Sequence, residues 1–414
     1  MTFCISAIAS NQGKTIVTTA LLSYFRKRVR AYKIGPDFID PQFHKVVSED
    51  DSINLDAFML GDKQLKWMFA NYKKEVNILE GVMGFYDGMD RGASAYDVTK
   101  ALQIPTVLVL DGSGSYITIS AVLKGLKTYK SDNTIKAVIL NKLSSPSHYE
   151  LIKRQIEKDF DDILVLGWVK KGLDSLKDTH LGLELDDMDK IDSISKEVLE
   201  HIELEKFEFL ESKPIMIEEY PFEKMQKSDK TLAIVRDKNF SFLYHDNYQF
   251  LCEVFRDVIM IDSTKDESIP QVDAVYIPGG YVESDKAYER IKCSENFKNS
   301  LKKHIARGGK VYAECAGLLY LGKSVDEKKM SGILPLEFSL QKRFVRLGYY
   351  QNKSGVKGHC FHYTKPKSLD GWCDILTKNN KGEFGSYHDK NIFGTYLHTI
   401  LRANADIVRK RFLS

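Results

Sequence analysis

The sequence lacks three features that would narrow its class at once: an excess of one charge, a long apolar run and a paired cysteine framework. The formal net charge is only +3 over 414 residues, which argues against nucleic acid as a partner. No apolar run approaches the ~20 residues of a membrane span, so no membrane association is expected. The six cysteines have neither disulfide nor zinc spacing, which predicts reduced thiols in a cytoplasmic protein: Cys4, Cys252, Cys293, Cys315, Cys360 and Cys373.

Length and pattern predict two α/β domains. A chain of 414 residues is too long for one ordinary domain, and it contains no internal repeat or low-complexity segment. The first nine residues lack a basic segment and lead into Gly-Lys-Thr, which indicates a strand and argues against a signal peptide. Alternating strand and helix signals favour a parallel sheet with helices on both faces. The predicted boundaries are a domain at 1–190, an acidic, lysine-rich linker at 191–229 and a second domain at 230–414.

Cys315 stands at a predicted corner between a strand and a helix. Residues 310–314 are typical of a short strand, and the run from Ala316 to Leu321 is typical of a helix start. Such a corner is a nucleophile elbow, which holds its side chain out from the sheet and places a thiolate at the positive end of a helix. The alternative is a buried cysteine on a core strand, the commoner fate of an intracellular cysteine.

Two other segments fit a nucleophilic cysteine. An apolar strand over 272–277 leads to Gly279 and Gly280, whose backbone N–H groups can face a developing oxyanion. A second short strand ends at His398, which can act as base to the thiol. The sequence therefore predicts acyl transfer through a thioester, with Cys315 and His398 as the catalytic pair.

The N-terminal part contains a phosphate-loop pattern. A strand over 3–9 is followed by a loop with Gly13, Lys14 and Thr15, and then by a helix. In this arrangement backbone N–H groups and the lysine hold phosphates, and the hydroxyl reaches Mg²⁺. The leading glycine of the full motif is replaced by Ile8, so a chance Gly-Lys-Thr in a loop is the alternative.

Four acids follow predicted strands of the same domain. Parallel strands end at one edge of a sheet, so these side chains are expected to meet beside the phosphate loop. There they could hold Mg²⁺, with Thr15 and Glu80 as metal ligands, or orient a substrate; the alternative is that they are ordinary turn residues. The four are Asp37, Asp40, Glu80 and Asp87. A metal site at His359, Cys360 and His362 is disfavoured, because neighbours on one strand point to alternate faces.

Several of these segments resemble one family. Pro-Gly-Gly-Tyr-Val-Glu-Ser from Pro278, Ala-Glu-Cys-Ala-Gly-Leu from Ala313 and Gly-Thr-Tyr-Leu-His from Gly394 resemble the class I glutamine amidotransferases, in the branch of the cobyrinic and cobyric acid synthases. The usual class I glutamate two residues after the histidine is Ile400 here, and this branch lacks it too. The resemblance therefore implies a Cys315/His398 pair. Glu-Gly-Val-Met-Gly-Phe-Tyr-Asp-Gly from Glu80 is similar to the same family.

The resemblance implies a dethiobiotin synthetase-like phosphate-loop domain followed by a class I amidotransferase-like domain. It implies ATP-dependent amidation of the a- and c-carboxylates of cobyrinic acid with glutamine-derived ammonia, in corrinoid biosynthesis. Mg²⁺ would accompany ATP, and Asn141 would contact the nucleotide base. Thr179 and Cys360 replace the family's arginine and glutamate, which puts contacts at those positions in doubt.

Three alternatives stay open at this point. The macrocycle could be hydrogenobyrinic acid or a nickel-sirohydrochlorin, because its identity is not legible in the motifs. Cobyric acid synthase is a second alternative, although the chain is short for it. The third is a regulatory phosphate-loop ATPase with an inert amidotransferase-like domain. A homodimer is also left open as the oligomeric state.

Overall fold

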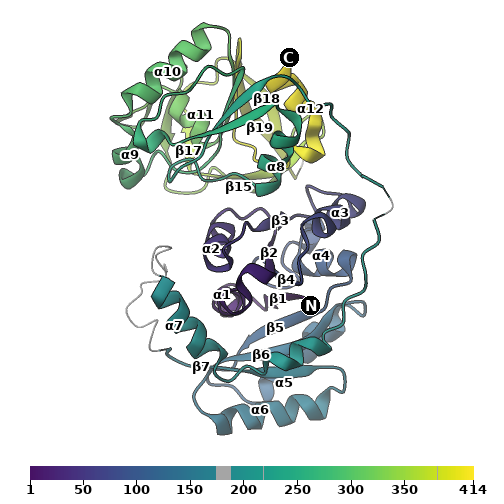
Figure 1. Cartoon of the computed structure of the whole chain (residues 1–414). Helices are drawn as coiled ribbons and strands as arrows, with labels where there is room; N and C mark the ends of the chain where they lie inside the picture. The colour runs from purple at the N-terminus through teal and green to yellow at the C-terminus, as the bar shows by residue number, and fades with distance from the viewer. Residues whose placement is uncertain (174–187, 218, 380) are drawn as a thin grey trace. The chain divides into compact units, whose positions relative to one another are not determined.

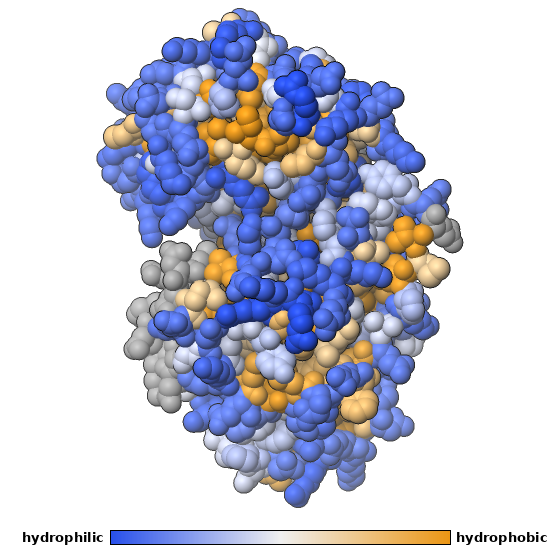
Figure 2. All heavy atoms as spheres, viewed as in Figure 1, coloured by the Kyte–Doolittle hydropathy of each residue, from blue (hydrophilic) through white to orange (hydrophobic). Residues whose placement is uncertain are grey.

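The computed structural model describes residues 1–173, 188–217, 219–379 and 381–414. The chain forms two compact units, 1–221 and 222–414, each with its own sheet (Figure 1). The segment around Thr179 lies outside the described residues. Within the described residues, no helix combines the length and the apolar character that a membrane crossing needs. Hydrophilic residues predominate on the face shown in Figure 2, with smaller apolar patches among them.

The first unit is built on a seven-stranded parallel sheet in the order β3-β2-β4-β1-β5-β6-β7. Its strands are almost wholly buried, as expected when helices cover both faces of a sheet. The strands are β1 (Thr2–Ala7), β2 (Val29–Ile34), β3 (Ile53–Leu55), β4 (Val76–Glu80), β5 (Thr106–Asp111), β6 (Ile135–Leu143) and β7 (Leu164–Lys170). The helices are α1 (Lys14–Phe25), α2 (Ile39–Ser48), α3 (Asp62–Tyr72), α4 (Ala95–Leu102), α5 (Ile117–Tyr129), α6 (Pro146–Asp159) and α7 (Met188–Leu199).

The division between the units, at 221/222, falls within the segment predicted as a linker, and the first part of that segment packs in the core of the first unit. Helix α7 buries Ile191, Ile194 and Val198, which recur at helical spacing, while its acidic and lysine side chains lie on the other faces. Farther on, the ring centroid of Phe207 lies 4.8 Å from that of Phe3 on β1. The charged residues of this stretch lie on its exposed side, and they dominate its composition. For that reason the composition suggested a linker.

The second unit combines a nine-stranded sheet, β16-β15-β18-β19-β20-β11-β10-β8-β9, with a four-stranded sheet, β13-β12-β14-β17. The strands are β8 (Thr231–Val235), β9 (Asp257–Ile261), β10 (Ala274–Ile277), β11 (Lys310–Glu314), β12 (Ser324–Val325), β13 (Lys328–Lys329), β14 (Glu337–Leu340), β15 (Arg346–Gln351), β16 (Lys357–His362), β17 (Thr364–Pro366), β18 (Trp372–Lys378), β19 (Lys381–Asp389) and β20 (Ile392–Thr395). The helices are α8 (His245–Val254), α9 (Asp285–Ile291), α10 (Glu295–Ala306), α11 (Ala316–Leu321) and α12 (Ala405–Val408).

The central strands of this sheet are parallel and set the position of the predicted site. β10 and β20 flank β11, with Ala313 paired to Ile277 on one side and to Gly394 on the other. Because the three strands run in the same direction, their carboxyl ends lie at one edge of the sheet. That edge carries the loop with Gly279, the corner at Cys315 and the segment that leads to His398. The predicted α/β architecture of both domains is confirmed.

Candidate active sites

Cys315 occupies the sharp corner between β11 and α11 that the sequence predicted. Its backbone has φ +42° and ψ −102°, a strained conformation for a residue with a side chain. The corner is close-packed, because a Cβ atom at Gly317 would lie 2.3 Å from the carbonyl oxygen of Ile277 at the end of β10. Only a glycine fits there, so the helix start and the end of β10 approach within backbone contact.

The electrostatics of this thiol differ from the expectation. Burial raises the pKa of Cys315 well above its ordinary value, and only the backbone N–H of Ala316 acts in the opposite direction among its leading influences. The side chain is 5% exposed, and the following helix has only six residues, so loss of hydration outweighs the helix terminus. The resting group is a neutral thiol, which needs a base to take its proton as it attacks.

His398, the predicted base, contacts an acid that was not predicted from the sequence. Nδ1 of His398 lies 2.8 Å from Oε2 of Glu314, and both side chains are almost fully buried. The imidazole also lies against the oxyanion loop, because a Cβ atom at Gly279 would stand 2.3 Å from Cε1 of His398. Glu314 therefore joins the predicted pair, Cys315 and His398, as a third candidate residue of this site.

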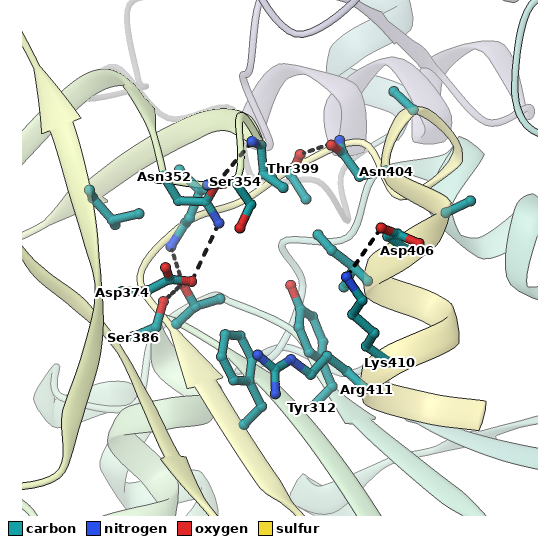
Figure 3. Close-up of a pocket in the computed structure, with 18 of the residues that line it drawn as sticks. Tyr312, Asn352, Ser354, Asp374, Ser386, Thr399, Asn404, Asp406, Lys410 and Arg411 are labelled. Carbon is teal, nitrogen blue, oxygen red and sulfur yellow. Dashed lines mark hydrogen bonds and ion pairs between the residues drawn. The ribbon is translucent and has the colours of Figure 1, made fainter. Parts of the chain in front are cut away.

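The opposite face of β11 borders a pocket of about 320 Å³ (Figure 3). Tyr312 points into it and shares this face of the strand with Glu314, whereas Ala313 packs in the core cluster that contains Cys315. Burial and the nearby Glu314 raise the pKa of Tyr312, which keeps its hydroxyl protonated beside the acid. Arg411 also lines the pocket and lies over the ring of Phe393, 3.9 Å from its centroid.

In the first unit the predicted phosphate loop leads directly into α1. Gly13 has φ +99°, and a Cβ atom there would lie 2.2 Å from Nδ2 of Asn141. The same Asn141 nitrogen donates to the carbonyl of Gln12 at 2.8 Å, so the predicted base contact lies against the phosphate loop. Nζ of Lys14 donates to the carbonyl of Ala9 at 2.8 Å, and burial lowers its pKa. The loop ends at the start of α1, and the first N–H groups of a helix can bind an anion.

Glu80, at the end of β4, is fully buried and has three partners. Thr15 Oγ1 donates to Oε1 at 2.8 Å, Nε2 of His44 lies 2.7 Å from Oε2, and Nζ of Lys33 lies 3.3 Å from Oε1. Burial alone would raise the pKa of Glu80, but Lys33 and His44 hold it well below its usual range. Glu80 is therefore an ionised acid next to the hydroxyl of the phosphate loop.

Lys33 gathers three of the four predicted acids. It forms ion pairs with Asp40, with Glu80 and, at 3.9 Å, with Asp37. Its side chain is only 3% exposed; burial would lower its pKa, yet the three carboxylates raise it. Lys33 was not predicted as a site residue from the sequence, although a lysine within a buried strand needs partners of opposite charge.

Asp87, the fourth acid, lies in the loop after β4 and accepts a hydrogen bond from the N–H of Gly84 at 2.8 Å. A Cβ atom at Gly84 would lie 2.4 Å from the carbonyl of Ile8, so this loop packs on the phosphate loop. Asp87, Glu80 and Asp40 all act to raise the pKa of Lys14. The four acids therefore surround two lysines at one edge of the sheet.

The donors here fit Mg²⁺, which prefers oxygen ligands and keeps several waters. The hydroxyl of Thr15 and the carboxylate of Glu80 are adjacent oxygens at the phosphate loop. In the described part of the chain, no group of three or more His, Cys, Asp or Glu residues is arranged to hold a metal by itself. No such group is found among His359, Cys360 and His362 either. Cys360 and His362 are buried, and Nδ1 of His362 lies 2.9 Å from the carbonyl of Thr364.

Two protein-family models match the two units. The CobQ/CobB/MinD/ParA nucleotide binding domain matches residues 3–177, and the CobB/CobQ-like glutamine amidotransferase domain matches residues 231–406. These matches agree with the phosphate loop in the first unit and with the cysteine site in the second.

Curated relatives match nearly the whole chain, and each is named cobyrinate a,c-diamide synthase. The relative from Saccharolobus solfataricus is 34% identical over 393 residues, covering 88% of this chain and 89% of the relative. That from Caldanaerobacter subterraneus subsp. tengcongensis is 33% identical and covers 99% and 97%. That from Fusobacterium nucleatum subsp. nucleatum is 32% identical and covers 95% and 98%. With this identity over nearly its full length, the chain belongs to the cobyrinate a,c-diamide synthase family.

Proposed function

We propose that this protein amidates the a- and c-carboxylates of cobyrinic acid, using ATP and ammonia released from glutamine. The observation that carries this proposal is the contact of His398 with both Glu314 and the oxyanion loop, next to a cysteine at a strained corner. A regulatory ATPase with an inert amidotransferase-like domain has no need of a buried histidine–carboxylate contact at that place. Cobyrinic acid is proposed as the substrate because the relatives are named cobyrinate a,c-diamide synthase.

The glutaminase step begins with a proton transfer. His398 takes the proton of Cys315, and Sγ attacks the side-chain carbonyl carbon of glutamine. Glu314 accepts from Nδ1–H of His398, which fixes the tautomer and stabilises the imidazolium. The oxyanion forms beside the N–H groups of the Gly279–Gly280 loop. His398 then donates the proton to the leaving ammonia, and water hydrolyses the thioester to glutamate.

The amide-forming step belongs to the first unit. Backbone N–H groups of the phosphate loop and Lys14 bind the phosphates of ATP, and Thr15 and Glu80 would hold Mg²⁺, which neutralises phosphate charge when bound. A substrate carboxylate attacks the γ-phosphorus, ADP leaves, and ammonia displaces phosphate from the acyl phosphate. Lys33 and its three acids lie where they can position that carboxylate.

The experiment compares wild type with Cys315→Ala. Each is incubated with ATP and a panel of unamidated macrocycles, cobyrinic acid, hydrogenobyrinic acid and nickel-sirohydrochlorin, with either glutamine or ammonium salt as nitrogen source. We expect product masses of a diamide from wild type with both sources, and from the variant with ammonium only. Loss of both activities in the variant would make Cys315 structural, and no glutamate release by wild type would favour the regulatory ATPase.

A further inference from the structure

Two backbone hydrogen bonds join the loop between β8 and α8 to the oxyanion loop. The N–H of Phe242 donates to the carbonyl of Gly279 at 3.0 Å, and the N–H of Tyr281 donates to the carbonyl of Asn239 at 2.8 Å. The carbonyl and the N–H of a trans peptide point in opposite directions. The bond from Phe242 therefore aims the N–H of Gly280 away from the β8–α8 loop.

Gly280 lies so close to the β8–α8 loop that the oxyanion loop cannot move nearer to it. Its φ is +148°, and a Cβ atom there would lie 1.9 Å from the carbonyl oxygen of Asn239. The two peptide units on either side of Gly280 are thus both set by backbone atoms of the β8–α8 loop. The position of the β8–α8 loop, which contains both Asn239 and Phe242, therefore sets the direction of the Gly280 N–H.

Asn239 is fixed by its side chain, which is fully buried and uses both ends of its amide. Nδ2 donates to the carbonyl of Ala287 at 2.8 Å, and Oδ1 accepts from Nε of Arg290 at 2.7 Å. Both partners lie on α9, the helix that follows the oxyanion loop. Arg290 also donates to the carbonyl of Lys238 at 3.4 Å.

We infer that Asn239 and Arg290 are positioning residues for the oxyanion loop. Neither touches glutamine; they tie α9 to the β8–α8 loop, so the Gly280 N–H keeps its direction as charge develops. An oxyanion donor acts mainly in the transition state, so a misdirected donor lowers kcat more than it raises KM. This inference rests on the glutaminase reaction proposed above.

The test uses Asn239→Ala and Arg290→Met in the full chain, with Asn296→Ala and Arg256→Met as controls. The control side chains are exposed, and their own partners are Asp266 and Asp257, away from the oxyanion loop. We expect glutaminase kcat to fall about 10-fold to 100-fold in the two test variants, with KM changed by less than about threefold. The controls and ammonium-dependent amidation should keep the wild-type rates.

A second readout separates positioning from general damage. An aldehyde analogue of glutamine forms a tetrahedral adduct with Cys315 whose oxygen needs the oxyanion donor, whereas iodoacetamide only needs an accessible thiol. We expect weaker inhibition by the aldehyde and unchanged alkylation in both variants. A wild type without glutaminase would refute the proposed function. Equal kcat in wild type and Arg290→Met, or parallel losses in aldehyde affinity and alkylation, would refute the positioning role alone.

Discussion

Oε2 of Glu314 lies 2.8 Å from Nδ1 of His398, and the residue after Glu314 in the chain is Cys315. The last residue of β11 and the corner that follows it therefore supply the acid and the proposed nucleophile. The first prediction tests whether Glu314 takes part in the proposed glutaminase reaction.

Glu314→Gln should lower glutaminase kcat by about 100-fold to 10,000-fold, because the neutral amide cannot hold the correct tautomer or stabilise the imidazolium. Amidation with ammonium salt should be unchanged, since it bypasses the thioester. Glutamate release and amide product are measured separately, with the half-exposed Glu337→Gln as the control. A variant that releases glutamate at the wild-type rate would show that His398 is oriented by other groups.

Lys14→Ala should lower ATP-dependent amidation by about 100-fold, because the charged partner of the phosphates is lost in a partly buried loop. Glutamine hydrolysis should survive, since Cys315 and His398 belong to the other unit. ADP formation and glutamate formation are followed in the same reaction, and the exposed Lys124→Ala is the control. Undiminished ADP formation would remove the phosphate-loop assignment.

Asp40→Asn should lower ligase turnover by about 10-fold to 100-fold through lost positioning, with little loss of stability. Its side chain is 25% exposed, and Lys33, which is only 3% exposed, keeps Glu80 and Asp37 as partners of opposite charge, so the loss of one of its three carboxylates should leave the fold intact. Asp51→Asn is the control for a carboxylate of the same exposure outside the cluster, since Asp51 is also 25% exposed and pairs with Lys45, which is 50% exposed. A collapsed midpoint with normal turnover of the folded fraction would make Asp40 a structural residue.

The second unit should lose stability in acid because of His362. Burial, followed by Arg346, lowers the pKa of this histidine from 6.5 to about 3. Below pH 6.5 the unfolded chain binds a proton that the folded state refuses, so unfolding free energy falls as pH falls toward about 3. The loss is roughly 2 to 3 kcal/mol between pH 7.5 and pH 4.5 for this one group.

The measurement is urea unfolding at both pH values, followed by Trp372, whose ring lies in the same stack as His362 and Tyr396. Trp67 and Trp168 are replaced by Phe so that only the second unit reports. His362→Gln should reduce the pH dependence, and the exposed His388→Gln should leave it unchanged. Equal pH dependence in all three proteins would contradict the assignment to His362.

The candidate site residues that could be predicted from the sequence are those that lie at the ends of strands or at glycines. The corner at Cys315 followed from a strand and a helix meeting at one residue, and Gly279 and His398 followed from the ends of neighbouring strands. Glu314 was missed because an acid was sought after His398, where Ile400 stands, buried. It could have been found as a charged residue at the last position of an otherwise apolar strand.

Lys33 was missed as well; it is a charged residue inside the buried strand β2. A charge in such a place needs a partner, but the sequence does not say which residue supplies it. The high pKa of Cys315 also could not be predicted, because it depends on the burial of the corner and not on the helix that follows. Apolar patterns with the periods of strands and helices predicted where these elements lie. Which buried charges pair with one another could be seen only in the packed structure.

Because Glu314 and Cys315 are neighbours in the chain, the proposed glutaminase reaction depends on the register of strand β11. A slip of one residue in β11 would exchange the faces of the sheet, turning the acid away from His398 and drawing the thiol into the strand. Glutamine hydrolysis is therefore a readout of correct strand pairing at the centre of a nine-stranded sheet. During refolding, glutamate release would report the moment at which β11 settles between β10 and β20.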